Sequence, residues 1–597
     1  MTTPAIIALL AVALVGLLSA VIGSLGVRMA RSTSDFLVAS RTVGPVANAG
    51  AISGEYLSAA SFLGIAGLIL REGADALWYP IAFCTGYLAL VLFVAAPLRR
   101  SGAYTVPDFA EARLSSPALR TVCTVVMLVI GWLYLLPQLQ GAGLALMTVT
   151  GLPSWSGVAL AGIVVVLTVV GGGMRSITFV QAFQFWIKLT AVAVPAIVLL
   201  GLFVNDAHTF DRPSAPRFTA ETVVEVRTDV SLEVVEPVRF TATGEVDGRT
   251  VDGEVTWRPG RYEVSAGAEL TFGAGSPVPT VAGAPATNRS WLEPVSGEAE
   301  HRLLEIYSIL LAGFLGTMGL PHVLVRFYTN PDGPTARRTT VAVLAMIGLF
   351  YLLVTMIGFF SRLYVPELLV SGETDAAVLL VPTAALGQGW AAWLLGGLVA
   401  AGAAAAFLST SSGLVVSLAG VLFTDVLRGR CRDFRLAAVL AALLPMVLAL
   451  TVTRLDFALT VPLVFAVAAS TFCPLLVLGI WWRGLTARGA TWGVVVGGVL
   501  SGGCVAVSLF APLPGGWLGV LLYSPAAVTV PVAFLTMVVV SRLTRAEVPA
   551  DVDYLLLQMH APERLGLSHD RLTGSHRLLR RGPSRVATGD GRGTGSA

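Results

Sequence analysis

The sequence contains little charge and almost no lysine. Only 13% of its 597 residues are charged and 55% are hydrophobic, whereas about one-quarter of the residues of a soluble globular protein are charged. Lys188 is the one lysine, so arginine carries nearly all of the positive charge. This composition excludes an ordinary soluble domain and predicts a chain that lies mostly within a lipid bilayer.

The motifs of soluble enzymes are also missing. The sequence contains no GxxxxGK[ST] phosphate-binding loop, and no ATPase or kinase module follows the apolar runs. The five cysteines show neither the spacing of a metal site nor a readable disulfide framework. We therefore predict neither an enzyme nor a nucleic-acid-binding protein, but a membrane protein that uses or dissipates an ion gradient.

Apolar runs long enough to cross about 30 Å of hydrocarbon recur along the chain. Arginine-rich loops follow every second run, beginning with the first, and the positive-inside rule places these loops in the cytoplasm. The N-terminus is then outside and the C-terminal tail inside, in a multi-pass protein of the plasma membrane. We predict about thirteen spans, near residues 5–27, 46–70, 76–97, 121–149, 156–172, 179–204, 303–328, 338–361, 376–424 (membrane core 393–422), 436–453, 459–481, 490–511 and 517–541.

Two polar segments interrupt this hydrophobic pattern. Residues 207–300 alternate apolar and polar side chains, as in EVDGRTVDGEVTWRPGRYEV, with Asp-Gly turns between β-type runs. They predict a small β-rich domain outside the cell, and a disordered insertion is the alternative. The tail 542–597 is polar and arginine-rich, which predicts disorder, although VDYLLLQMHAPERLGL is compatible with one short helix at the inner membrane face.

The second apolar run reads NAGAISGEYLSAASFLGIAG and has polar residues at its centre. Secondary transporters build their sites where Gly, Pro and polar residues interrupt a span, because unwound backbone carbonyls become ligands there. Glu55 is an ionisable residue at membrane depth, which indicates a functional role. The alternative is that Glu55 caps a half-helix or pairs with an arginine.

The seventh run reads LLAGFLGTMGLPHVLVRFYTNPDGP, and its glycines and proline disfavour a continuous helix. Freed amides at the N-terminus of a half-helix attract anions. We therefore predict that Gly316, Thr317 and Gly319 cradle a carboxylate, with positive potential from His322 and Arg326. The alternatives are a packed, hydrogen-bonded His322 and an Arg326 that marks the cytoplasmic end of the span.

The ninth run contains AAFLSTSSG, with four consecutive hydroxyl residues from Ser409 to Ser412. A hydroxyl in a membrane span needs a hydrogen-bond partner or another ligand. Two interpretations remain open at this point. The hydroxyls bond back to carbonyls one turn earlier and allow close helix packing, or some of them bind a ligand.

The two interrupted runs lie five spans apart, which indicates inverted repeats with a site at their interface. The predicted organisation begins with the first span and a cytoplasmic loop and continues through two repeats separated by the β-rich insert. Two further spans and the tail follow. The corresponding residues are 1–45, 46–206 (spans 2–6), 207–300 (insert), 301–484 (spans 7–11), 485–541 (spans 12–13) and 542–597.

Five stretches between Ser34 and about Arg542 share features with a known family. They read SDFLVASRTVGPVANAGAISGEYLSAASFLGIAG, GGMRSITFVQAFQFWIK, GTMGLPHVLVRFYT, AAFLSTSSGLVVSLAGVLFTDVL and AASTFCPLLVLGIWWRGLTARGA. Together they resemble the sodium:solute symporter family. The pieces SAASFLG, GLPHVLVRF and GLTARGA most resemble its cation/acetate branch, whose members move short monocarboxylates. The resemblance implies an all-α polytopic membrane protein with the LeuT-type fold of five-plus-five inverted repeats.

The resemblance also implies a sodium site, in which hydroxyls of the ninth span meet backbone carbonyls. Counted from the FTD motif and the SFLGIAG glycines, the implied ligands are Gly54, Leu57, Ala406, Ser409 and Thr410. Sodium is a hard cation and suits such neutral oxygens. The other two hydroxyls of the ninth run keep the packing interpretation.

Two positions depart from the family pattern. Gln181 stands where many members have an aspartate, and Tyr56 stands at an aspartate of the proline-type members, next to Glu55. These changes argue against a proline carrier and leave proton coupling as an alternative. We favour sodium because the hydroxyl pair is retained.

We predict a symporter that couples inward sodium movement to uptake of a small monocarboxylate, such as acetate, propionate or pyruvate, by alternating access. Besides the cradle and His322, the predicted substrate contacts are Tyr56, Ser58, Ser61 and Gln138. The partners are then a small anion and the lipid bilayer, and the oligomeric state stays open. The alternatives are a proton-coupled symporter, a sodium symporter for an amino acid or a sugar, a passive channel without evident filter residues, and a sensor whose tail is too short for a signalling module.

Overall fold

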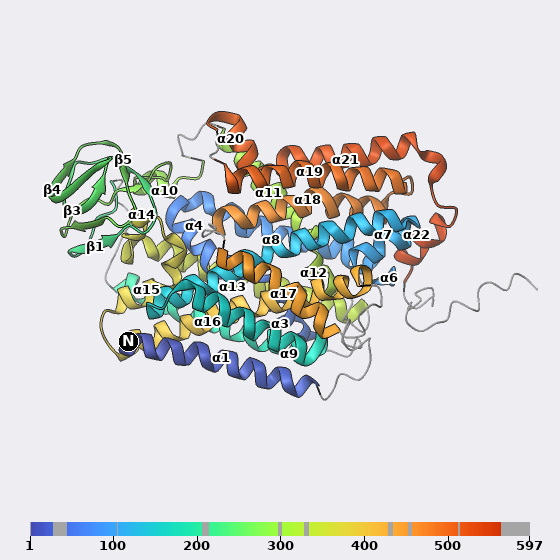
Figure 1. The fold of residues 1–597 in the computed structure, drawn as a ribbon, viewed down its shortest axis with the longest axis horizontal. Coiled ribbons are helices and arrows are strands. Elements are labelled where there is room, and N and C mark those ends of the chain that lie inside the picture. The colour runs from blue at the N-terminus through green and yellow to red at the C-terminus, as the bar shows by residue number, and fades with distance from the viewer. Residues whose placement is uncertain are drawn as a thin grey trace, which may run out of the picture.

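The computed structural model describes residues 2–27, 44–103, 105–205, 214–295, 301–326, 333–427, 434–451, 457–511 and 514–562. Within these ranges, 11 helices are long and apolar enough to cross a membrane. The helices form one bundle, and a β layer lies at one end of it (Figure 1). The prediction of a polytopic α-helical membrane protein with a small β-rich insert is confirmed.

The first half of the chain supplies the helices up to the insert. The bounds of these elements are α1 (Thr3–Val27), α3 (Pro45–Tyr56), the π-helical turn η2 (Ala60–Gly64), α4 (Ile65–Glu72), η3 (Gly73–Leu77), α5 (Trp78–Leu90), η4 (Val91–Ala95), α6 (Ala96–Arg100), α7 (Val106–Leu114), α8 (Pro117–Thr150) and α9 (Ser154–Asn205).

The second half begins after the insert with another interrupted helix. Its elements are α11 (Arg302–Gly319), α12 (Pro321–Val325), α13 (Gly333–Tyr364), α14 (Leu368–Ser371), η6 (Thr374–Ala376), α15 (Ala377–Leu386), α16 (Trp390–Val421), η7 (Leu422–Val426), α17 (Phe434–Thr451), α18 (Phe457–Trp481), α19 (Ala487–Phe510), α20 (Gly516–Tyr523), α21 (Ala526–Leu543), η8 (Arg545–Glu547) and α22 (Val552–His560). The short helix expected in the tail is α22, and the tail beyond it lies outside the described residues.

Helix α9 contains the predicted fifth and sixth spans as two arms that run in opposite directions. Gly23 of α1 lies next to both Thr168 and Ser176, and the Ser176 hydroxyl donates to the Gly23 carbonyl at 2.5 Å. Further along, Gln184 donates to the Ser19 hydroxyl at 2.9 Å, which lies back toward the start of α1. Thr168 and Ser176 therefore lie beside the same turn of α1, and the second arm runs back along α1.

Both predicted breaks are present. Helix α3 ends at Tyr56, and Leu57 has φ −78° and ψ 87°, which is not helical. Helix α11 ends at Gly319, and Leu320 is extended with φ −72° and ψ 113° before Pro321 opens α12. Proline fits the first helical position because it lacks an N–H, whereas it would break a helix interior.

Helix α16 runs through the centre of the bundle against α3 and α9. Its run of alanines and glycines allows close approach, since a Cβ at Gly402 would collide with Ala191 of α9 and one at Gly413 with Glu55 of α3. The hydroxyl residues of α16 are buried at this contact. The break in α3, the second arm of α9 and the centre of α16 therefore meet.

The insert is an antiparallel sheet, so the alternative of a disordered insertion is wrong. Its core stacks Phe240 on Phe272 and Phe218 on Phe272, with ring centroids 5.0 and 4.9 Å apart. The strands lie in the order β1-β6-β3-β5-β2-β7, with β4 paired to β3. Their bounds are β1 (Thr222–Glu225), β2 (Val230–Val234), β3 (Val238–Val246), β4 (Arg249–Trp257), β5 (Gly260–Val264), β6 (Glu269–Phe272) and β7 (Thr280–Val281).

Of the two Asp-Gly pairs in this region, one makes the expected turn. Asp247 and Gly248 join β3 to β4 with φ of 50° and 70°, the left-handed pair of a two-residue hairpin. The second pair, Asp252 and Gly253, lies inside β4 instead. Its neighbours continue the pairing with β3, so the turn signal is overridden there.

The insert is attached to the bundle through α10 (Asn288–Leu292). Trp291 is fully buried, and its indole N–H donates to the carbonyls of Ile69 and Leu70 of α4 at 2.9 and 3.0 Å. The Arg362 guanidinium lies 4.8 Å from the centroid of the Trp291 ring.

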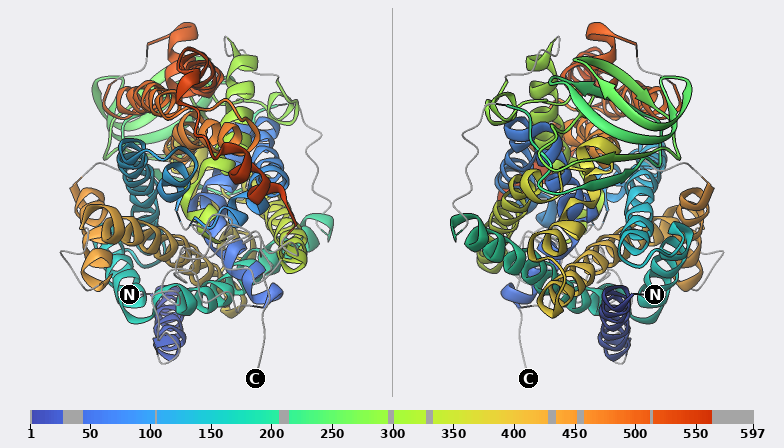
Figure 2. Two further views of the ribbon diagram at one scale, coloured as in Figure 1. Left: turned by 90° about the vertical axis from the view of Figure 1, so that its right-hand side faces the viewer. Right: turned by 90° about the vertical axis from the view of Figure 1, so that its left-hand side faces the viewer.

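The sheet and the N-terminus lie at the same end of the bundle, and α22 lies at the opposite end (Figures 1 and 2). The predicted orientation across the membrane stays a prediction.

Candidate transport site

The hydroxyl pair of α16 faces the break after α3. The Ser409 hydroxyl donates to the Gly54 carbonyl at 2.7 Å and to the Ala406 carbonyl at 3.2 Å. The Thr410 hydroxyl donates to the Glu55 carbonyl at 2.9 Å. All of these groups are buried. The residues predicted as sodium ligands thus lie around one small polar centre, where α3 unwinds.

The ammonium of Lys188 lies in this centre. It donates to the Gly54 carbonyl at 2.5 Å, the Leu57 carbonyl at 2.7 Å and the Ser409 hydroxyl at 2.9 Å. Lys188 is fully buried on the second arm of α9. Three of the five predicted sodium ligands are therefore already occupied by a side-chain cation, so this oxygen set does not fit a sodium ion while the ammonium is in place.

A second polar network continues from this centre toward the seventh-span break. Arg326, directly after α12, pairs with the Glu55 carboxylate and donates to the Gln181 side chain. Gln181 in turn donates to the Ser409 carbonyl at 2.7 Å. Glu55 and Arg326 are 2% and 1% exposed, and such an ion pair needs these extra hydrogen bonds to offset desolvation. Glu55 therefore pairs with an arginine, which is one of the alternatives given for it in the sequence analysis.

A cavity of about 20 Å³ lies on the other side of the break. Tyr56, Ser58 and Ser61 line it, as predicted for the substrate wall, together with aromatic residues of α5, α8, α13 and α18. The Ser61 hydroxyl is 3.0 Å from the Tyr351 hydroxyl. The volume holds about one water, so an organic anion enters only if these side chains move apart. The full lining is Tyr56, Ser58, Ala60, Ser61, Gly64, Ile65, Leu68, Tyr79, Phe83, Tyr134, Tyr351, Val461, Pro462 and Phe465.

Two polar side chains near the cavity have an atom without a hydrogen-bond partner among the described residues. Gln138 accepts from the Ala59 amide at 2.9 Å, which fixes the orientation of its amide, because only oxygen can accept from that N–H. Its Nε2 is buried and unpartnered. His322 stacks on Tyr134 with centroids 5.2 Å apart, and its Nδ1 is likewise unpartnered. Tyr134 itself donates to the Ser58 hydroxyl at 3.2 Å.

The carboxylate cradle predicted in the seventh span does not form at the predicted residues. Gly316, Thr317 and Gly319 belong to the continuous helix α11 rather than to the start of a half-helix. A Cβ at Gly316 or Gly319 would lie 2.5 Å from the carbonyl oxygen of Phe465 or Ala468. The glycines therefore serve close packing against α18. The Thr317 hydroxyl lies 3.1 Å from the hydroxyl of Tyr56, which lines the cavity. The same Thr317 hydroxyl donates to the Gly313 carbonyl at 2.7 Å.

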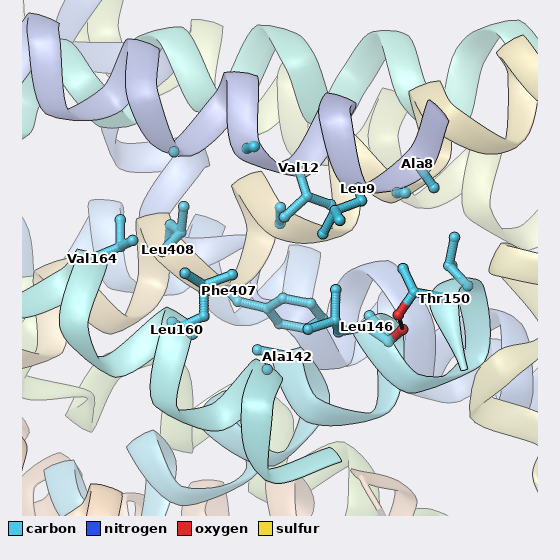
Figure 3. A pocket seen from close by; sticks show the side chains of 18 of the residues that line it. Ala8, Leu9, Val12, Ala142, Leu146, Thr150, Leu160, Val164, Phe407 and Leu408 are labelled. Carbon is cyan, nitrogen blue, oxygen red and sulfur yellow. Dashed lines mark hydrogen bonds between the residues drawn. The ribbon is translucent and has the colours of Figure 1, made fainter. Parts of the chain in front are cut away.

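A larger, apolar cavity lies elsewhere among the described residues. It has a volume of about 270 Å³ and opens between α1, α8, α9 and α16. Figure 3 shows Phe407 pointing into it among aliphatic side chains. Its one polar lining side chain is Thr150, whose hydroxyl donates to the Leu146 carbonyl. A small anion finds no free donor among these side chains, so the apolar cavity is not the candidate site.

Sequence reasoning missed the role of Lys188. The signal was available, because the chain has one lysine and places it in an apolar run. Its partners are 134 and 221 residues away in the sequence, at Gly54 and Ser409. Spacing along one helix could not indicate that contact.

Comparisons with known proteins agree with this architecture. The chain is 29% identical to the Bacillus subtilis protein named "Uncharacterized symporter YwcA" over 545 residues, which is 88% of this chain and 92% of that protein. It is 26% identical to the "Monocarboxylic acid transporter" of Corynebacterium glutamicum over 533 residues, 85% of this chain and 86% of that protein.

A solved structure shares the fold. It shows the substrate-bound, outward-open state of a Na⁺-coupled sialic acid symporter, with a TM-score of 0.57 at 13% identity. The match covers 89% of this chain and 98% of that one. The fold is therefore the LeuT type that the family resemblance implies. The profile of the sodium:solute symporter family matches residues 36–223 and 278–497, more than half of the chain, and the protein belongs to this family of transporters.

Proposed function

We propose that this protein is a secondary active symporter that couples the inward movement of a cation to uptake of a small monocarboxylate, such as acetate, propionate or pyruvate. The observation that carries the substrate class is the unpartnered Gln138 Nε2 beside the break. A buried donor without a partner is costly unless a ligand satisfies it. The name of the Corynebacterium glutamicum relative supports the same class.

A carboxylate fits the chemistry around this donor. Gln138 offers an N–H, and the hydroxyls of Ser58 and Ser61 line the adjacent cavity. His322 donates through Nδ1 in the tautomer that carries the proton there. The aromatic side chains of the lining, such as Phe83, suit the short apolar end of the substrate.

The coupling cation has two candidates. Sodium is expected from the family and from the sodium-coupled symporter of the same fold. The proton is the alternative, and it is favoured by the Lys188 ammonium at the position that a sodium ion would need. We also propose residues 46–206 and 301–484 as inverted repeats, because each begins with a broken helix.

The proposed setting is the plasma membrane, with the N-terminus and the β-rich insert outside and α22 on the cytoplasmic face. The insert and the N-terminus share one end of the bundle, which supports this arrangement (Figure 1). A reporter enzyme fused after residue 562 tests the side of the C-terminal tail. Activity in the cytoplasm is expected, and activity outside the cell would reverse the topology.

Uptake into proteoliposomes tests the function. Labelled acetate, pyruvate, proline and glucose are compared under separate sodium and proton gradients, and we expect saturable uptake of the two monocarboxylates. Acetamide, the neutral analogue of acetate, should compete about tenfold more weakly or worse, because a charge-assisted hydrogen bond contributes about 1.5–3 kcal/mol. Equal competition by acetamide, or uptake of proline or glucose alone, would refute the monocarboxylate assignment.

Gln138→Leu provides the matched test of the site. Removing the donor should raise the acetate concentration for half-maximal uptake about tenfold. The control is Gln184→Leu on α9, whose side chain donates to Ser19 of α1 and does not line the cavity. An unchanged acetate affinity in Gln138→Leu would exclude this side chain from substrate binding.

A further inference from the structure

The one lysine of the chain lies among the oxygens that sodium would use. We infer that the Lys188 ammonium takes the place of the sodium ion at this centre, so that the transporter works without binding sodium there. The inference rests on the proposed function only for its uptake measurement, since the occupancy of the centre can be measured without any organic substrate.

The ammonium has a complete set of partners. An –NH₃⁺ group has three donors and no acceptor, and Lys188 uses all three, on the carbonyls of Gly54 and Leu57 and on the Ser409 hydroxyl. Its side chain has no exposed surface. The two carbonyls are those that the break in α3 frees from helical pairing. The lysine thus satisfies the acceptors that would otherwise recruit an ion.

Sodium cannot join the ammonium at this place. Both cations need the same oxygens, and two positive charges a few ångströms apart repel strongly in a buried site, where water screens them little. The remaining predicted ligand hydroxyl, on Thr410, is turned to the Glu55 carbonyl. A bound sodium ion would therefore require Lys188 to leave the centre.

The packing of α9 against α3 places the lysine there. Gln181, Phe185 and Lys188 lie on one face of α9 at helical spacing. A Cβ at Gly54 would lie 2.5 Å from the Gln181 carbonyl oxygen and 3.3 Å from the Phe185 side chain. Because Gly54 has no side chain, the two helices approach closely enough for the ammonium to reach the freed carbonyls.

The charges around the centre favour an anion in the neighbouring cavity. Helices α1 and α16 contribute no titratable side chain. Among the described residues that contact the centre, the ionisable side chains are Lys188, Glu55 and Arg326, and the last two form an ion pair. Lys188 lies next to Leu57, at the break that also lines the substrate cavity with Ser58. A tethered cation thus supplies the positive potential that a bound sodium ion would give to a carboxylate.

Binding of ²²Na⁺ to the purified protein tests the inference directly. We expect no saturable binding to the wild type at millimolar sodium. We expect saturable binding to Lys188→Ala, which frees the carbonyls of Gly54 and Leu57. Gln184→Ala on the same arm of α9 is the control and should behave as the wild type. Saturable ²²Na⁺ binding to the wild type that Ser409→Ala weakens tenfold would overturn the inference.

Uptake provides the second readout. Replacing sodium by choline should change wild-type acetate uptake by less than twofold, whereas Lys188→Ala should become sodium-stimulated. A merely structural role for Lys188 would lower uptake in the variant without creating a response to sodium. If no monocarboxylate is transported but the wild type still excludes ²²Na⁺ and Lys188→Ala binds it, the substrate proposal fails and this inference stands. If acetate is transported only with sodium, this inference fails and the substrate proposal stands.

Discussion

Replacing the hydroxyls of α16 one at a time should separate the residues that hold the centre from those that only pack. Ser409→Ala and Ser411→Ala each remove one hydroxyl oxygen, from two nearby buried positions of α16. The Ser409 hydroxyl accepts from the Lys188 ammonium at 2.9 Å and donates to the Gly54 carbonyl at 2.7 Å. The Ser411 hydroxyl is buried without a hydrogen-bond partner among the described residues.

The two substitutions therefore differ in the sign of their effect. A hydrogen bond to a charged group contributes about 1.5–3 kcal/mol, and its loss leaves a buried donor of Lys188 unpaired. Ser409→Ala should lower the free energy of unfolding by about 2–3 kcal/mol. Ser411→Ala removes an unsatisfied hydroxyl and should leave stability unchanged or raise it by about 1 kcal/mol. Ser412 bonds back to the Ser409 carbonyl at 3.0 Å, so its alanine variant should fall between them.

Reversible chemical unfolding in detergent micelles measures these differences. Tryptophan fluorescence follows the transition, and midpoint shifts at a constant slope report changes in stability. The same variants reconstituted into liposomes show whether the centre also matters for transport. Equal losses at Ser409 and Ser411 would mean that the hydroxyls act through packing alone, and the argument from the Lys188 contacts would fall.

Three further outcomes follow from buried contacts. Glu55→Ala should destabilise the protein by about 3–5 kcal/mol because it removes the carboxylate from a buried ion pair with Arg326. Asp553→Ala breaks an exposed pair with Arg483 and should cost about 0–1 kcal/mol in the same unfolding assay. Similar losses in the two variants would refute the importance of the buried pair. Trp291→Ala should cost about 3–5 kcal/mol, and a change below about 1 kcal/mol would mean that the insert is not anchored through this ring. Replacing residues 214–280 by a Gly/Ser linker, which keeps Trp291, should leave gradient-driven uptake measurable in proteoliposomes, and complete loss in a correctly inserted variant would make the sheet part of the mechanism.

Local signals in the sequence were sufficient to place the breaks, and the family resemblance selected the hydroxyl pair. A glycine- and serine-rich centre in a long apolar run, or a proline after three glycines, disfavours a helix whatever surrounds it. The break in α3 follows Tyr56, inside the predicted polar centre, and α11 ends directly before Leu320 and Pro321. The pair Ser409 and Thr410 faces α3 because a helix presents residues three and four positions apart on one face, and Ala406 fixes that face.

The carboxylate cradle was misplaced because glycine gives the same sequence signal for two different purposes. A glycine can end a helix and free its amides, or it can stay inside a helix and let another backbone approach. At Gly316 and Gly319 the second purpose applies, since the carbonyls of Phe465 and Ala468 occupy the space that a Cβ would need. These partners lie on α18, about 150 residues away in the sequence, and one sequence alone does not show which helix packs there. The same limitation concealed Lys188.

The close packing at glycines and the cation at the centre have one physical origin. Where α3 unwinds, its carbonyls lose their helical donors, and in a membrane protein they must find others within the chain or from an ion. Gly54 allows α9 to approach, and this approach brings the Lys188 ammonium to the carbonyls. Gly413 leaves room for Glu55, whose carboxylate pairs with Arg326 after α12. A symporter that binds sodium at such a break must leave these carbonyls free for part of its cycle. In this chain a side chain meets the same demand, so the break persists without an ion, and the positive charge beside the substrate cavity is built into the sequence.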